Sequence, residues 1–208
     1  MVLYEPGKRI QQVYFVTHGV VSLVKKLDSG ETIEIATVGP EGMIGTVLAL
    51  GSDTTDNRAI VQVPGESLSM KASTFKRVLK RTPKLHQILL RYFLALLNQV
   101  AQSAACNRVH SVDERCARWL LMTHDRVKED TFLLTQDFLA QMLGVHRPTV
   151  SVAASMLQKA GLIRYVRGRI TITDRKGLEK ASCGCYRSIR KEYERLLNSG
   201  EGSPQQSQ

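Results

Sequence analysis

Two metal-binding residue types are scarce in this chain of 208 residues, which contains four cysteines and five histidines. Small secreted domains need a dense disulfide framework, and the four cysteines do not supply one. The first residues also lack the pattern of a signal peptide, so we expect a protein of the reducing cytoplasm. The cysteines are Cys106, Cys116, Cys183 and Cys185.

The distribution of these residues disfavours a metal centre. No cysteine precedes Cys106, whereas an iron–sulfur cluster needs about four thiolates grouped together. His18 is the only histidine in residues 1–82, which argues against a metal site of the clustered-histidine, cupin type. Cys183 and Cys185 form a C-x-C pair without a second pair or a neighbouring histidine in the sequence. We therefore expect buried thiols and no metal.

Long apolar runs and catalytic patterns are also missing. The densest apolar stretch, residues 88–100, contains Arg91, so we expect no membrane span and no membrane partner. No Ser/His/Asp constellation or glycine-rich phosphate loop points to catalysis, and we expect the protein not to be an enzyme. With 43% hydrophobic residues, the chain can form the cores of two modest domains.

Carboxylates are absent between Asp137 and Asp174, although this stretch contains five basic residues. The chain has a net charge of +10, and the surplus is uneven. Residues 1–107 contain 12 Lys and Arg against 8 Asp and Glu, whereas residues 141–195 contain 12 against 4. A basic surface confined to one region favours a polyanionic partner. The five basic residues are Arg147, Lys159, Arg164, Arg167 and Arg169.

Residues 135–161 have the pattern of a helix-turn-helix. Thr135 is suited to cap a first helix, whose apolar face recurs at helical spacing, and Gly144 is suited to end it. A second helix is expected over residues 146–160, with Pro148 in its first turn, where proline is tolerated. An ordinary helical hairpin with solvated arginines is the plainer alternative.

The residues after this motif predict a small β-hairpin. The segments L-I-R-Y-V and R-I-T-I-T alternate in hydrophobicity and are separated by Arg167 and Gly168. A hairpin directly after a helix-turn-helix forms a wing. The helix-turn-helix, A-G-L-I and R-G-R-I-T-I-T-D together resemble the C-terminal domain of Crp/Fnr transcription regulators. That resemblance implies a DNA-binding homodimer with an N-terminal sensor domain.

The resemblance implies an α+β fold with a jelly-roll-like β-roll over residues 1–82, a dimerisation helix over 83–110 and a winged helix-turn-helix domain over 111–197. A disordered tail is expected over 198–208 because of its Ser, Gly and Gln content. Since family members usually have a short helix and strand before the point where this chain starts to match, the entrance to the roll is expected to be truncated or rebuilt.

Arg147 matches the base-reading arginine of the family, but the match around it is incomplete. Pro148 stands where a glutamate usually follows, and Val152 stands where a second arginine is usual. We therefore expect a different half-site. The complete set of expected DNA-binding residues is Thr135, Gln136, His146, Arg147, Pro148, Thr149, Ser151, Val152, Arg167 and Arg169.

Short β-branched runs cut by glycine predict the roll, with turns expected at His18-Gly19 and Pro64-Gly65 and one wet face on the strand over residues 32–37. In nucleotide-binding members, a Gly-Glu pair and an Arg-Ser or Arg-Thr pair hold the ribose and the cyclic phosphate. The matching residues here are Gly45, Thr46, Arg58 and Ala59. Because only Arg58 keeps its polar group, we expect no cofactor and no cyclic nucleotide, with Arg58 in a structural ion pair.

A helix over residues 74–83 and a longer one over 85–110 are expected next, followed by a capped helix from Ser111 and a final helix that starts at Asp174 and ends near residue 197. The longer helix has apolar residues at alternating spacings of three and four, which is typical of a coiled-coil seam. The family resemblance assigns it to the dimer interface. The expected interface residues are Leu90, Phe93, Leu97, Val100, Ala104 and Asn107.

The expected partners are therefore double-stranded DNA, a second copy of the chain and, at a promoter, RNA polymerase. The alternative from another class is a cyclic-nucleotide-responsive regulatory subunit that acts through protein contacts. The departures at Thr46 and Ala59 argue against that alternative.

Overall fold

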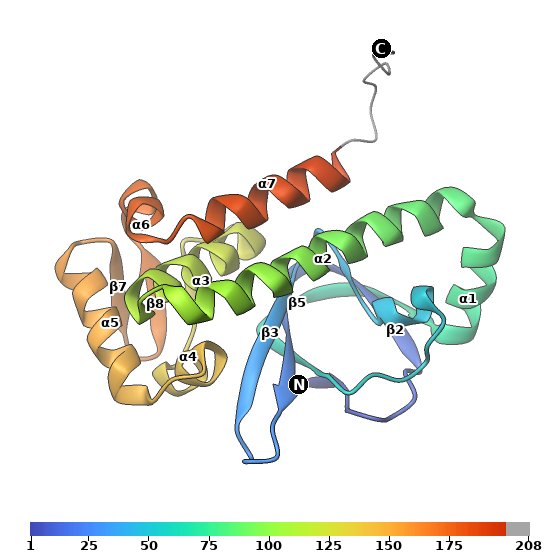
Figure 1. Ribbon diagram of the computed structural model, residues 1–208, viewed down its shortest axis with the longest axis horizontal. Coiled ribbons are helices and arrows are strands. Elements are labelled where there is room, and N and C mark those ends of the chain that lie inside the picture. Colours follow the sequence, from blue (N-terminus) through green and yellow to red (C-terminus); the bar gives the residue numbers. More distant parts are fainter. Residues whose placement is uncertain (199–208) are drawn as a thin grey trace, which may run out of the picture.

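The computed structural model describes residues 1–198, and the tail expected after Asn198 lies outside the described residues. Figure 1 shows a sheet-rich N-terminal half and a mostly helical C-terminal half, connected by one long helix that runs along both. Among residues 1–198, no helix is both long enough and apolar enough to cross a lipid bilayer.

The N-terminal half is built around an antiparallel five-stranded sheet with the order β1-β5-β2-β3, in which β4 also pairs with β2. The long strands β2 and β5 pair along most of their length. Its elements are β1 (Val2–Tyr4), β2 (Gln12–Lys26), β3 (Thr32–Val38), β4 (Met43–Ile44), the 3-10 helix η1 (Thr46–Leu50) and β5 (Arg58–Lys71).

The turns expected at His18-Gly19 and Pro64-Gly65 are wrong, since β2 and β5 continue through them. The pairing register shifts between Val16 and Val21, so these positions are β-bulges within one bent ribbon. Gly19 has a φ of 94°, and a Cβ on Gly65 would lie 2.1 Å from the carbonyl oxygen of His18. Glycine is therefore needed because the two backbones approach closely, rather than because the chain reverses.

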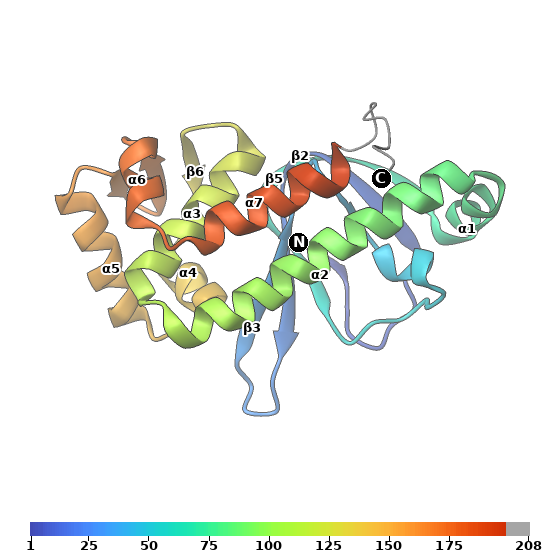
Figure 2. The same ribbon diagram turned by 45° about the horizontal axis from the view of Figure 1, so that its top comes forward.

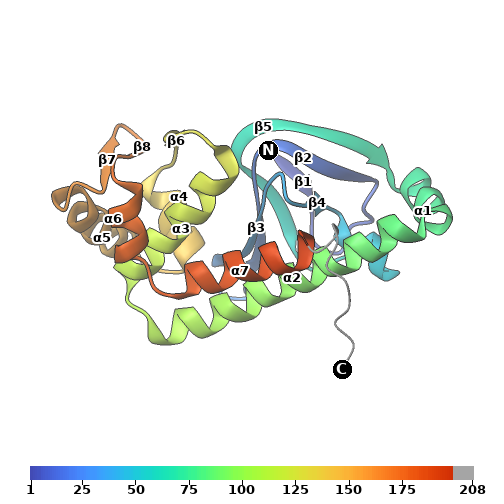
Figure 3. The same ribbon diagram turned by 90° about the horizontal axis from the view of Figure 1, so that it is seen from above.

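Two helices follow the sheet, with bounds slightly different from those expected: α1 is Ala72–Arg81 and α2 is Pro83–Val109. Pro83 begins α2 because its missing N–H would have no partner in a first turn. Leu89, Tyr92 and Leu96 bury one face of α2 in the core of the roll. Figures 2 and 3 show α7 running alongside α2 on another face.

The C-terminal half contains five helices around a three-stranded sheet with the order β6-β8-β7 among the described residues. Ser111 and Glu114 form the expected capping box at the start of α3. The strand β6 was not expected from the sequence. The elements are α3 (Val112–Val127), β6 (Thr131–Leu133), α4 (Gln136–Leu143), α5 (Arg147–Lys159), β7 (Ile163–Val166), β8 (Arg169–Ile172), α6 (Arg175–Ala181) and α7 (Cys185–Leu197).

The single final helix expected after Asp174 is also wrong in part. Asp174 caps α6 as expected, accepting a hydrogen bond from the Gly177 N–H at 2.9 Å. The chain then leaves helical geometry at Ser182, which is extended, before α7 begins at Cys185. The break redirects α7 along α2 and places Cys183 and Cys185 in the interior.

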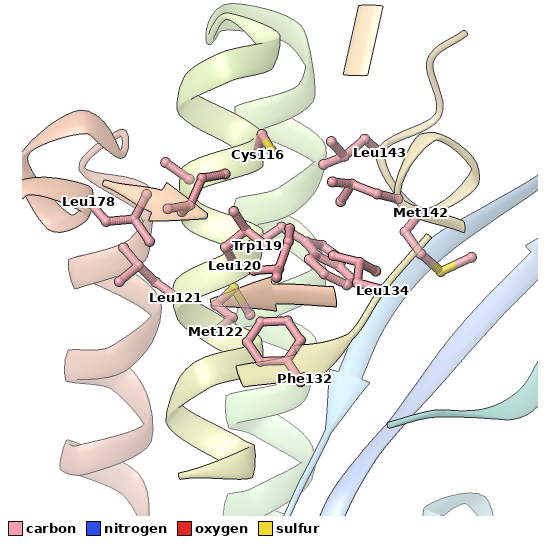
Figure 4. Packing of buried hydrophobic residues seen from close by; sticks show 14 of the residues in the cluster. Cys116, Trp119, Leu120, Leu121, Met122, Phe132, Leu134, Met142, Leu143 and Leu178 are labelled. Carbon is pink, nitrogen blue, oxygen red and sulfur yellow. The ribbon is translucent and has the colours of Figure 1, made fainter. Parts of the chain in front are cut away.

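The core of the C-terminal half forms around α3, as expected for Trp119, Leu120 and Met122, which are all buried. Figure 4 shows these side chains facing Phe132 and Leu134 from the β6 region and residues of α4. The same cluster includes Val20, Val24 and Val63 of the roll. One core therefore continues across the junction between the two halves.

The expectation of one wet face on β3 is wrong for the same reason. Ala36 and Thr37 point to opposite faces, yet both are buried. The helices α2, α3 and α4 all pack against β3, and Trp119 of α3 contacts Glu34 on the face that the alternating pattern assigned to solvent. Polar residues on that face, including Glu34, therefore need partners from the C-terminal half.

Candidate nucleic-acid interface and effector pocket

The helix-turn-helix consists of α4 and α5 and has the expected local geometry. The Thr135 hydroxyl accepts a hydrogen bond from the Phe138 N–H at 3.1 Å and caps α4. Gly144 ends α4 with a φ of 64°, a left-handed conformation that costs glycine little. Val150 is fully buried and Val145 packs against the same core, so these two residues fix the angle between the helices.

The first turns of α5 present an exposed edge to solvent. His146, Arg147, Pro148 and Thr149 are all exposed, and His146 is the N-cap residue. Val152 is 61% exposed, although apolar residues on the opposite face of α5 are buried in the core. The side of α5 that carries Arg147 and Val152 is therefore accessible to the edges of base pairs.

Two of the expected DNA-binding residues, Gln136 and Ser151, form a hydrogen bond that connects the two helices of the motif. The Ser151 hydroxyl lies 2.6 Å from Gln136 Oε1 and 3.1 Å from the Arg147 carbonyl oxygen. The Ser151–Gln136 contact ties α5 to the start of α4, and both residues are half-buried. Arg147 also approaches the exposed carboxylate of Asp137, with 3.4 Å between Nε and Oδ1. A phosphate or base would compete with that exposed pair at little cost.

The wing is the hairpin of β7 and β8, with Arg167 and Gly168 at its tip. Both tip residues have positive φ, 48° and 73°, as a two-residue type I′ turn requires. Arg167 and Arg169 are exposed. The Tyr165 hydroxyl donates to the Leu134 carbonyl oxygen at 2.8 Å and holds the wing beside the start of α4.

A groove beside the reading end of α5 was not expected from the sequence. The hairpin between β2 and β3 reaches α4, and Ile33 lies against the turn at Gly144. A groove of about 740 Å³ separates Glu31 and Thr32 of the hairpin from His146 and Thr149. The roll therefore borders the helix-turn-helix directly.

The four residues at the expected effector positions make contacts within the roll itself. The Arg58 guanidinium donates from Nε to Glu5 Oε2 at 2.7 Å, which confirms the expected structural ion pair. The Thr46 hydroxyl donates to the Met43 carbonyl oxygen at 3.0 Å and is buried. Ala59 is fully buried, and Gly45 adopts a φ of 91° next to Val13.

A cavity of about 320 Å³ does open in the roll, but other residues line it. Its walls include Val16, His18, Val20, Gln62 and Glu66, from β2 and β5. Mainly apolar walls with few polar groups are typical of sites for small, weakly charged molecules.

The helix α2 exposes an apolar stripe opposite the face that packs on the roll. Leu90 is 44% exposed and Leu97 is 50% exposed, while Ala104 and Asn107 are also exposed. The remaining two expected interface residues, Phe93 and Val100, are half-buried, and Val100 packs against the roll core. Leu94 belongs to the stripe but was not among the expected residues.

A polar network joins the roll to α3 and was not found from the sequence. Trp119 Nε1 donates to Glu34 Oε1 at 2.8 Å, and the Ser22 hydroxyl lies 2.7 Å from Glu34 Oε2. Ser22 also lies 2.9 Å from Gln62 Oε1, and Gln62 Nε2 donates to the Thr123 hydroxyl.

The protonation state of Glu34 decides how this network is satisfied. A single hydroxyl proton on Ser22 cannot serve both oxygens. A protonated Glu34 supplies the second proton, so that Glu34 donates to the Ser22 oxygen and Ser22 donates to Gln62 Oε1. Burial raises the pKa of Glu34 to about 7, against hydrogen bonds from Ser22 and Trp119 and the charges of Arg118 and Arg126.

Two protein-family models match the chain. Residues 1–82 match a cyclic nucleotide-binding domain, and residues 114–181 match a Crp-like helix-turn-helix domain. Among curated proteins, the CRP-like cAMP-activated global transcriptional regulator of Mycobacterium tuberculosis is 25% identical over 185 residues, which cover 85% of this chain and 80% of that protein. The global nitrogen regulator of Nostoc sp. is 23% identical over 180 residues, covering 82% of this chain and 80% of that protein.

Solved structures of regulators share the fold. FixK2 from Bradyrhizobium japonicum superposes with a TM-score of 0.74 at 18% identity, covering 88% of this chain and 93% of FixK2. The CRP-family transcriptional regulator TTHB099 from Thermus thermophilus superposes with a TM-score of 0.72 at 20% identity and the same coverages.

The Glu34 network predicts a dependence of stability on pH. Because the folded-state pKa is about 7 and the ordinary value is 4.5, folding takes up a proton between these two pH values. The stabilisation by neutral Glu34 is complete below pH about 4.5 and is lost as the pH rises through 7, a change of roughly 3 kcal/mol.

Glu34→Gln keeps a neutral side chain at every pH, so it should be more stable than the wild type at pH 8 and should flatten this part of the pH profile. Urea unfolding at several pH values measures the effect. Glu66→Gln, at an exposed carboxyl group of β5, is the matched control. An unchanged pH profile for Glu34→Gln would contradict the prediction.

Proposed function

Since this chain belongs to the Crp/Fnr family of DNA-binding transcription regulators, we propose that it binds an inverted-repeat site in double-stranded DNA as a homodimer. The observation that carries the proposal is the exposed side of the first two turns of α5, which presents Arg147 and Val152 beside a basic wing. A surface without carboxylates over residues 138–173 suits a phosphate backbone.

The apolar stripe of α2 supports the dimer. Leu90, Leu94 and Leu97 would remain in water in a monomer, although they lie on one face of a long helix. Two copies of α2 packed about a two-fold axis would bury this stripe, and Asn107 would set the pairing near one end. Two copies of α5 would then have to stand about 34 Å apart to enter successive major grooves.

Within each half-site, Arg147 reads the sequence and the wing sets the affinity. An arginine can donate two hydrogen bonds to guanine O6 and N7, a contact worth about 1 to 3 kcal/mol of discrimination. Val152 is placed to contact a thymine methyl group, whereas Thr149 and His146 can reach phosphates or bases. Arg167 and Arg169 reach phosphates, which carry no sequence information.

The roll acts as the effector domain, but for a ligand other than a cyclic nucleotide. The name of the M. tuberculosis relative describes activation by cAMP. In this chain, Thr46 and Ala59 lack the polar groups for that ligand, and Arg58 is paired with Glu5. The apolar cavity between β2 and β5 suits a small, weakly charged effector better.

The protein thus acts by binding DNA in the cytoplasm rather than by catalysing a reaction. RNA polymerase is its partner at the promoter. A regulatory subunit that acts through protein contacts is disfavoured, because the Crp-like helix-turn-helix match covers the basic region.

Substitutions in α5 and in the wing should have different effects on DNA binding. Arg147→Ala should flatten the preference at one base pair per half-site, by a factor of about 5 to 150. Arg167→Ala should weaken all sequences alike and make the salt dependence shallower.

Selection of bound sequences from a random pool, followed by titrations at several salt concentrations, distinguishes these two effects. Arg187→Ala, at an exposed position on α7, is the control and should change neither property. If Arg147→Ala left base preference intact, α5 would not be the reading helix.

Leu97→Glu should convert the dimer to a monomer or unfold the protein. Dimerisation would bury the new charge in an apolar interface, at a cost of several kcal/mol. Sedimentation at micromolar concentration measures the assembly. Leu68→Glu makes the same change at a leucine that is 69% exposed on β5 and should leave the dimer intact. A wild-type protein that sediments as a monomer would disprove the assembly.

Isothermal calorimetry should detect no binding of cyclic AMP or cyclic GMP, and neither nucleotide should change the affinity for DNA. Two of the three polar contacts that these ligands need are missing, at Thr46 and Ala59, and the third residue, Arg58, is in an ion pair. Micromolar binding that is lost in Arg58→Ala but kept in Arg9→Ala, another exposed arginine of the roll, would restore the nucleotide interpretation.

A further inference from the structure

Four metal-ligating side chains meet where the end of α2 lies against the start of α7. They are Cys106, His110, Cys183 and Cys185, and their donor atoms all lie within 4.8 Å of one another. Cys106 Sγ is 3.4 Å from Cys183 Sγ, and Cys185 Sγ is 3.6 Å from His110 Nδ1. The two halves of the cluster are separated by more than 70 residues in the sequence.

The sequence places no further cysteine and no histidine near the C-x-C pair, but the fold brings Cys106 and His110 next to it, so the expectation of an isolated pair is wrong. Cys106 lies in the last turn of α2, and His110, four residues later, is the C-cap of that helix, so both lie at the same end of α2. Cys183 lies in the break before α7, and Cys185, on the other side of Gly184, is the first residue of α7. This break redirects the chain so that both sulfurs face the end of α2.

The spacing of the donors fits a tetrahedral ion. With metal–sulfur bonds of about 2.3 Å, two sulfurs on a tetrahedral zinc lie about 3.8 Å apart, and a sulfur and a nitrogen lie slightly closer. The distances of 3.4 and 3.6 Å are already near these values. The widest pairs need to close by about 1 Å, which small side-chain rotations can supply.

The surroundings favour a centre with net negative charge. Arg115 and Arg118 are buried, and within residues 1–198 neither lies within 4.0 Å of a carboxylate oxygen. Arg115 donates to the Leu143 carbonyl oxygen and Arg118 to the Ser103 hydroxyl, which leaves the Nε of each buried without a partner.

Buried cations without a counter-charge are unfavourable. A divalent ion held by three thiolates and a neutral imidazole has a net charge of −1, which would offset one of the two positive charges of these arginines.

We propose that Cys106, His110, Cys183 and Cys185 bind one zinc ion, which fastens the start of α7 to the end of α2. Three sulfurs and one imidazole in tetrahedral geometry favour zinc over harder cations. All four positions come from the protein, so the ion is structural and leaves no open coordination site. Each cysteine binds as a thiolate, and the three thiol protons pass to solvent.

The position of the ion gives it a role in the orientation of the C-terminal half. His110 is the C-cap of α2 and directly precedes Ser111, which caps α3. Gln102 Nε2 donates to Cys185 Sγ at 3.0 Å and orients that ligand. The ion therefore fixes the junction between α2 and α3 from the outside, at the point where the two helices could otherwise pivot.

Metal analysis of the untagged, full-length protein tests the proposal. We expect about one zinc per chain by elemental mass spectrometry. After chelation, reloading with Co²⁺ should produce the visible absorption of tetrahedral cobalt and a thiolate charge-transfer band. These readouts do not involve DNA binding, so the site can fail while the proposed function stands.

Single substitutions test which side chains bind the metal. His110→Ala and Cys183→Ala should lose stoichiometric metal, whereas His110→Cys should retain it because it keeps four donors. Cys116→Ala is the matched control, since Cys116 is a buried cysteine of the α3 core, away from the cluster. Circular dichroism identifies variants that do not fold, and His110, which is only half-buried, gives the best-tolerated change.

Two results would overturn the proposal. One is a wild-type protein that contains no metal and gives no cobalt spectrum after reduction and reloading. A Cys106–Cys183 disulfide in a metal-free protein belongs to this case, and it would leave Cys185 and His110 without a role. The other is full metal content in folded His110→Ala and Cys183→Ala.

Discussion

The buried guanidinium of Arg126 joins the two halves of the molecule. Arg126 belongs to α3, but its carboxylate partner, Glu41, lies in the roll at 2.8 Å, and Gln99 of α2 accepts a further hydrogen bond. A Cβ on Gly39 would collide with the Arg126 side chain, so the loop of the roll closes tightly over it. Removing the carboxylate of Glu41 would leave this buried cation without its counter-charge, which is costly. The orientation of the helix-turn-helix therefore depends on the loop before β4.

Features set by local chemistry could be predicted from the sequence. Thr135, Gly144 and Ser111 mark helix ends because a side-chain cap or a left-handed glycine satisfies nearby backbone groups. The wing follows from two alternating segments around a two-residue turn. In each case the residues that determine the structure lie within a few positions of the feature itself.

Features that depend on distant partners could not be predicted. The alternation in β3 indicated a wet face, but Glu34 on that face accepts a hydrogen bond from Trp119 of α3, 85 positions away. Gly19 and Gly65 resemble turn glycines in the sequence, yet their role is to let two paired strands approach. Cys183 and Cys185 looked isolated because Cys106 and His110 come from a different helix. Local patterns contain no information about such pairings, which only the folded chain creates.

At the tip of the wing, Arg167 adopts a backbone conformation that other residue types adopt more easily. At a φ of 48°, Arg167 has the left-handed conformation, which glycine or asparagine adopts at lower cost. No hydrogen bond or ion pair of the Arg167 side chain offsets this cost within the part of the chain that the structure describes. The hairpin thus gives up some folding free energy to hold a cation at its outermost point, an exchange of stability for function that is common at binding surfaces.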